Sequence, residues 1–196
     1  MNLPTKITMS RIFVIPIITV LFYVSFPYHY AWTAALFALA ALTDMIDGKL
    51  ARKRNEVTSL GKLLDPISDK ILACSVLIMI AANGDKMFYF NPPVGVIAVA
   101  LIVAREILIG AMRTVAAGKG LILAADKLGK TKTIFLNVSL PVLLLADLHV
   151  AIKIAGNVLF LLALVFTVIS GVNYLVKNRR VFSDKEENAP KEGSDD

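Results

Sequence analysis

The feature that most constrains this chain is a series of six apolar stretches, separated by short segments in which basic residues gather. A bilayer core of about 30 Å is spanned by about 20 apolar residues in a helix. The stretches lie at residues 9–26, 31–52, 61–82, 92–117, 134–146 and 152–176. They predict an all-α membrane protein with six transmembrane helices, in which residues 1–176 form a single domain.

Composition and charge agree with this class. Hydrophobic residues make up 57% of the 196 residues and charged residues only 18%, against about 45–50% hydrophobic residues in soluble domains. The first stretch is longer than a signal-peptide core and no small-residue cleavage site follows it, so it is interpreted as an uncleaved span. The single cysteine, Cys74, excludes an internal disulfide.

The basic residues predict the orientation of the chain. If the N-terminus is cytoplasmic, the external segments are residues 27–30, 83–91 and 147–153. Of the 21 Lys and Arg residues these segments hold only Lys86 and Lys153. Because cytoplasmic loops carry the excess of Lys and Arg, both termini are expected in the cytoplasm of a multi-pass protein of the cell membrane.

The net charge of +6 is interpreted as this topology signal, together with attraction to anionic lipids or phosphorylated substrates. No alternation of aromatic and basic residues supports base stacking, so a nucleic-acid partner is not expected. Residues 177–196 begin with a basic cluster and end in charged and small residues, which predicts a disordered cytoplasmic tail.

Four aspartates stand where the second and third stretches approach each other in sequence. Asp44 and Asp47 are three residues apart, and Asp65 and Asp69 are four apart, so each pair shares one face of its helix. The short polar connection between the stretches predicts antiparallel neighbours. All four carboxylates are therefore expected to converge at the cytoplasmic ends of these two helices.

Such a cluster predicts a metal site. Converging carboxylates repel unless cations intervene, hard oxygen ligands suit Mg²⁺ or Mn²⁺, and four carboxylates suit two ions that clamp a phosphoryl group. Gly48 and Ala51 leave room beside the acids, and Arg52 and Thr58 are placed to reach phosphates. The simpler alternative is that the acids only solvate helix ends, but ionisable groups at membrane depth are costly and favour a function.

The stretch resembles the signature of the CDP-alcohol phosphotransferases, D-x2-D-G-x2-A-R-x8-G-x3-D-x3-D. Every fixed position is matched, by Asp44, Asp47, Gly48, Ala51, Arg52, Gly61, Asp65 and Asp69. The resemblance implies six transmembrane helices with a short N-terminal interfacial segment, and usually a homodimer. It also implies that the four aspartates bind two divalent ions, with Asp69 as the general base that deprotonates the acceptor hydroxyl.

The resemblance extends to residues that line the nucleotide site in this family. It assigns that role to Gly48, Ala51, Arg52 and Thr58. Residues 4–11, PTKITMSR, are similar to the family segment P-N-x-(L/I)-T-x2-R, which adds Thr8 to the nucleotide site. Thr5 departs from the usual asparagine.

Basic residues farther along the chain are candidates for binding the acceptor substrate. Arg105 and Arg113 are eight residues apart, about two turns on one helix face, and Lys130 and Lys132 are expected in the next cytoplasmic loop. Together they predict a pocket for an acceptor phosphate, and Glu106 is interpreted as a structural partner of Arg105. Positive-inside topology alone is an alternative explanation for the lysines and Arg113.

The segments around the second aspartate pair, Arg105 and the two lysines resemble those of one branch of the family. Enzymes of that branch transfer a phosphatidyl group from CDP-diacylglycerol to sn-glycerol 3-phosphate, giving phosphatidylglycerophosphate and CMP. Three alternatives stay open: another acceptor within the family, such as phosphatidylglycerol in cardiolipin synthesis; a cation transporter; and a scaffold without catalysis. Transport is disfavoured because transporters place such acids near the midplane. The last two stretches carry no diagnostic motif.

Overall fold

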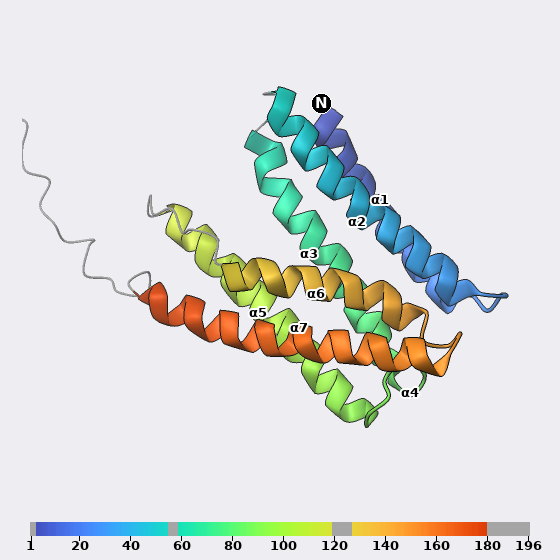
Figure 1. Ribbon diagram of the computed structural model, residues 1–196. Helices are drawn as coiled ribbons and strands as arrows, with labels where there is room; N and C mark the ends of the chain where they lie inside the picture. The colour runs from blue at the N-terminus through green and yellow to red at the C-terminus, as the bar shows by residue number, and fades with distance from the viewer. Residues whose placement is uncertain (1–2, 55–58, 119–126, 180–196) are drawn as a thin grey trace, which may run out of the picture.

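The computed structural model describes residues 3–54, 59–118 and 127–179, with their side chains from residue 13 onward except 44–67, 69 and 127. This part of the chain is entirely helical (Figure 1). Its elements are α1 (Leu3–Tyr23), α2 (His29–Arg54), α3 (Ser59–Ala82), α4 (Gly84–Met87), α5 (Pro92–Gly118), α6 (Lys127–Leu144) and α7 (Val150–Lys177). The predicted tail lies outside the described residues beyond position 179.

The six long helices correspond one by one to the six apolar stretches. The helices differ from the predicted stretches in two places. Residues 3–8 form the first turns of α1 and not a separate interfacial element. Helix α6 begins at Lys127, seven residues before the apolar stretch that predicted it, because Lys132 is buried against α5 and the helix continues through it. The prediction that Lys130 and Lys132 lie in a loop was therefore wrong.

Successive long helices run in opposite directions. Helix α1 packs against α2 and α3, α6 packs against α7 and α2, and α5 packs against α7 and α3. The starts of α1, α3 and α6 and the ends of α2, α5 and α7 consequently lie toward one end of the molecule, at the upper left of Figure 1. We call this the aspartate end, because it is the end to which both aspartate pairs belong in sequence.

A continuous apolar core joins the helices. Its fully buried side chains include Phe22, Phe37, Leu77, Ile102, Leu140 and Phe160. Burying such side chains contributes about 1.5–3 kcal/mol each. The core therefore holds the helices against one another and makes the aspartate end a fixed arrangement of helix termini.

Large apolar side chains also cover the outer surface. Helices α5 and α7 are long and apolar enough to cross a membrane, since each contains an 18-residue segment with a mean hydropathy of 2.3. Only 28% of each segment is buried inside the protein. Ile97 and Leu101 on α5, and Val165 and Val172 on α7, are among the exposed residues. An exposed apolar surface of this extent is typical of a face in contact with lipid. Shorter apolar stretches lie at Phe13–Tyr23, His29–Thr43 and Lys70–Ala82.

Candidate active site

Both aspartate pairs lie in helices. Asp44 and Asp47 belong to the last three turns of α2, and Asp65 and Asp69 belong to the first three turns of α3. Because α2 and α3 run in opposite directions, both pairs lie in the segments toward the aspartate end (Figure 1). The side chains of these four residues are outside the described part, so their convergence stays a prediction.

The predicted nucleotide residues are distributed over the same end of the bundle. Gly48, Ala51 and Arg52 follow the first aspartate pair in α2, and Thr8 lies near the start of α1. Thr58 falls outside the described residues. Because successive helices alternate in direction, the helix termini that carry these positions lie at the same end of the bundle.

All four predicted acceptor residues line one cavity of about 620 Å³. Arg105 and Arg113 come from α5, and Lys130 and Lys132 come from the first two turns of α6. Helices α2 and α3 close the other sides, through residues such as Ala38 and Lys70. Tertiary structure thus gathers side chains that are up to 100 residues apart in the chain, from Ala38 to Val138.

Glu106 is the acidic member of this cavity. Its carboxylate pairs with the Lys132 ammonium group, and its Oε1 atom also accepts from Arg105 Nη1 at 3.2 Å. The Lys132 side chain is only 3% exposed, so a large part of its charge is compensated locally. Glu106 is therefore the counter-charge of the buried Lys132 as well as a partner of Arg105, the contact expected from the sequence.

The cavity retains a strong positive excess. Among its described lining residues, one carboxylate stands against five cations, Lys70, Arg105, Arg113, Lys130 and Lys132. Such an excess in a partly enclosed space attracts anions and favours phosphate over neutral ligands. The side chains that remain most available to a ligand are Arg113 and Lys130, which are both exposed.

Lys70 is a lining residue that sequence reasoning did not assign. It directly follows Asp69 in α3 and lies against Gly110 of α5, so closely that a methyl group at position 110 would be 2.9 Å from its Nζ atom. The available signal was a lysine one residue after a predicted catalytic aspartate, at the start of the apolar part of α3. Lys70 connects the aspartate segment of α3 to the cationic cavity.

Two contacts from α7 were also unexpected. Ser170 Oγ accepts from Arg105 Nη2 at 3.0 Å, and Tyr174 OH accepts from Arg113 Nε at 3.1 Å. The Arg113 guanidinium also lies over the Tyr174 ring, 5.3 Å from its centroid. No motif in the sequence marks either residue.

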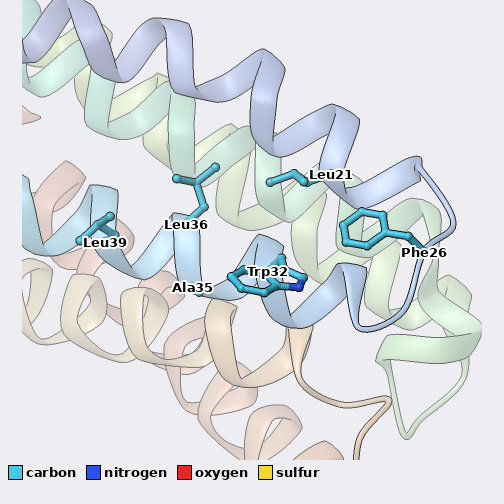
Figure 2. A pocket seen from close by; sticks show the side chains of 6 residues that line it. All are labelled: Leu21, Phe26, Trp32, Ala35, Leu36 and Leu39. Atoms are coloured by element: carbon cyan, nitrogen blue, oxygen red, sulfur yellow. The ribbon is translucent and has the colours of Figure 1, made fainter.

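A second cavity, of about 390 Å³, lies between the later part of α1 and the early part of α2 (Figure 2). Leu21, Phe26, Trp32, Ala35, Leu36 and Leu39 line it. It carries no ionisable side chain, so it offers nothing for phosphoryl chemistry. Among the side chains that the structure describes, no cluster of three or more His, Cys, Asp or Glu residues forms a further metal site.

Comparison with known proteins places the chain in a family. The sequence profile of the CDP-alcohol phosphatidyltransferases matches residues 1–169. A protein of Rickettsia bellii named CDP-diacylglycerol–glycerol-3-phosphate 3-phosphatidyltransferase is 36% identical over 184 residues, which cover 92% of this chain and 97% of the relative. A protein of Bacillus subtilis with the same name is 38% identical over 192 residues, which cover 90% of this chain and 95% of the relative. The chain, with its paired aspartates in α2 and α3, therefore belongs to the CDP-alcohol phosphatidyltransferase family.

Proposed function

We propose that this protein transfers the phosphatidyl group of CDP-diacylglycerol to sn-glycerol 3-phosphate, giving phosphatidylglycerophosphate and CMP. The relatives named above carry this activity in their names and align over nine-tenths of the chain. The structural observation that carries the proposal is the cationic cavity lined by α3, α5 and α6. A small acceptor with a phosphate group needs fixed cations of this kind.

The aspartates fit a pair of hard divalent cations, because carboxylate oxygens are the ligands that Mg²⁺ and Mn²⁺ prefer. One pair in the last turns of α2 and one pair in the first turns of α3 also supply the number of donors that two ions require. In the proposal Asp44, Asp47, Asp65 and Asp69 hold two such ions. When bound, these ions neutralise charge on the pyrophosphate and on the departing CMP.

The nucleotide is assigned to the neighbouring turns. Gly48 and Ala51 are small residues beside the aspartates of α2, so they leave space for the cytidine diphosphate group. Arg52, Thr58 and Thr8 supply donors for its phosphates and base. This arrangement places the diacylglycerol part of the substrate toward the apolar portion of the helices.

The acceptor phosphate is assigned to the cationic cavity. Arg113 and Lys130 are its most exposed cations, Arg105 and Lys132 lie deeper beside Glu106, and Lys70 faces them from α3. In the proposal, the hydroxyl of an acceptor held here is directed toward Asp69, the residue that precedes Lys70 in α3.

The chemical step is a displacement at phosphorus. Asp69 accepts the proton of the acceptor hydroxyl, whose oxygen forms a new bond to the β-phosphorus of CDP-diacylglycerol. The bond from that phosphorus to the bridging oxygen breaks, and CMP leaves with the electron pair. Positioning of both substrates by fixed charges accounts for much of the rate enhancement in such a reaction.

In this proposal all six long helices span the membrane, and the aspartate end is cytoplasmic. The support is the outward-facing apolar surface and the distribution of Lys and Arg in the sequence. Both termini then lie in the cytoplasm, where soluble glycerol 3-phosphate is available. The protein is proposed to act as a homodimer, as the family resemblance implies.

The test is CMP release by the purified protein in detergent, with CDP-diacylglycerol, Mg²⁺ or Mn²⁺, and one acceptor at a time. Glycerol 3-phosphate, inositol phosphate, serine and phosphatidylglycerol are the acceptors to compare with a reaction that lacks an acceptor. CMP release with glycerol 3-phosphate alone supports the proposal. Release with phosphatidylglycerol alone replaces it with cardiolipin synthesis, and no release with any acceptor contradicts the enzyme assignment.

A further inference from the structure

Among the buried polar residues of helix α7, two contact arginines of α5 that line the cationic cavity. Ser170 is fully buried and Tyr174 is 2% exposed. They are four residues apart, so they lie one turn apart on the same face of the helix. Each contacts a different arginine of α5, and the two arginines are themselves two turns apart.

Ser170 holds the deeper arginine. Its hydroxyl oxygen accepts from Arg105 Nη2 at 3.0 Å and donates to the Thr167 carbonyl at 3.3 Å. The bond to Thr167 orients the hydroxyl so that its lone pair is available to the guanidinium. Within the described part of the chain, Arg105 Nε is buried without a hydrogen-bond partner, so this side chain depends on its terminal nitrogens for its position.

Gly171 keeps the path of Arg105 open. A methyl group at position 171 would lie 3.2 Å from Arg105 Cγ, which is tighter than ordinary packing. The serine and the glycine therefore act together, since one leaves space for the aliphatic part of the arginine and the other fixes its head group.

Tyr174 holds the second arginine in a different way. It accepts from Arg113 Nε through its hydroxyl and lies beneath the guanidinium with its ring. A guanidinium has five N–H donors in a rigid fork. Because the Tyr174 hydroxyl uses only Nε, both terminal nitrogens of Arg113 remain free of that bond. Arg113 and Arg105 both line the cavity.

We propose that Ser170 and Tyr174 are positioning residues for the acceptor, which fix Arg105 and Arg113 as a preformed clamp for its phosphate. The inference rests on the proposed function and adds a role for α7. An arginine that is already ordered loses little rotamer freedom when the phosphate binds, so Ser170 and Tyr174 raise the affinity for the acceptor without touching it.

The test separates positioning from simple packing of α7. Tyr174→Phe keeps the ring and removes the hydroxyl, Ser170→Ala removes the other acceptor, and Ser170→Thr restores a hydroxyl. For the two deletions the KM for glycerol 3-phosphate rises on the order of tenfold, while kcat and the KM for CDP-diacylglycerol stay near wild type. Ser170→Thr recovers part of the affinity. The matched control is Val172→Ala, since Val172 lies between them in sequence and is 57% exposed.

Two results overturn the inference. An unchanged KM for glycerol 3-phosphate in both deletions shows that the hydroxyl groups do not position the arginines. Equal losses in kcat and in both KM values, together with a lower melting temperature, show a packing role only. Wild-type protein that releases no CMP with glycerol 3-phosphate contradicts the proposed function itself, and the wild-type arm of the assay detects that failure separately.

Discussion

Individual charges set the character of the cationic cavity. Glu106 compensates Lys132 and contacts Arg105, whereas Arg113 is held by a neutral hydroxyl and an aromatic ring. A neutral partner orients a guanidinium without reducing its charge. The exposed side of the cavity thus keeps its full attraction for a phosphate, while the buried side has the carboxylate that burial of a lysine requires.

The first prediction concerns the proposed base. Asp69→Asn is expected to lower kcat by about 10²–10⁴-fold, because the amide cannot accept the proton of the attacking hydroxyl. CMP release measures the rate, and circular dichroism checks that the helices persist. Asp85→Asn is the matched control, since Asp85 is an exposed residue of α4 at the opposite end of the bundle. Wild-type turnover by Asp69→Asn would exclude this residue as the base.

The second prediction concerns the ion pair between α5 and α6. Glu106→Gln leaves the Lys132 ammonium group buried without its counter-charge, and is expected to cost roughly 2–4 kcal/mol of folding free energy. The double variant Glu106→Gln with Lys132→Met removes both charges and is expected to recover part of that loss. Thermal unfolding in detergent measures the three variants. Equal melting temperatures for wild type and Glu106→Gln would show that the pair does not stabilise the fold.

At the scale of helices, α6 and α7 pack closely against each other. Gly156 of α7 lies against the α6 backbone, where a methyl group would be 3.1 Å from the Leu143 nitrogen and 3.3 Å from its Cα atom. Backbone atoms cannot move aside as a flexible side chain can. Gly156 and Leu143 lie beside the connection between α6 and α7, at the end of the bundle opposite the aspartate end, so this contact limits how closely the two helices approach each other there.

The third prediction follows from that contact. Gly156→Ala is expected to destabilise the protein by about 1–3 kcal/mol through overpacking, seen as a lower melting temperature in detergent. The KM for CDP-diacylglycerol is expected to stay near wild type, because α2 and α3 do not contain the altered position. Val158→Ala, at a 52% exposed position of the same helix, is the control. An unchanged melting temperature would mean that the helices separate at little cost.

For the whole molecule, the alternating directions of the helices assign every helix terminus to one of two ends. The aspartate end contains the residues of the proposed chemistry. The other end contains α4 and the connections from α1 to α2 and from α6 to α7 (Figure 1). An enzyme that takes a lipid-linked nucleotide and a water-soluble acceptor needs its reacting groups at a single membrane surface. If the six long helices span the membrane as proposed, the aspartate end and both termini lie at one membrane surface, which meets this need.

The fourth prediction tests this topology. In a Cys74→Ala background, Asp85→Cys is expected to react with a membrane-impermeant maleimide in intact cells, because the proposed orientation places α4 at the external end. Lys177→Cys, at the end of α7, is expected to react only after the membrane is made permeable. Both positions are exposed, so accessibility within the protein is matched. Labelling of Lys177→Cys in intact cells would contradict a cytoplasmic aspartate end.

The sequence by itself determined the helical class, the six helix positions and the two aspartate pairs, because hydrophobic stretches and the i, i+3 and i, i+4 spacings are local properties of the chain. It also predicted the four basic residues of the cavity, although it placed Lys130 and Lys132 in a loop. Only the tertiary structure decided which polar side chains are in contact: Glu106 with Lys132, Arg105 with Ser170, and Arg113 with Tyr174. These pairs join α5 to α6 and α7 across 26 to 65 residues, and no local pattern encodes a contact that packing of separate helices creates.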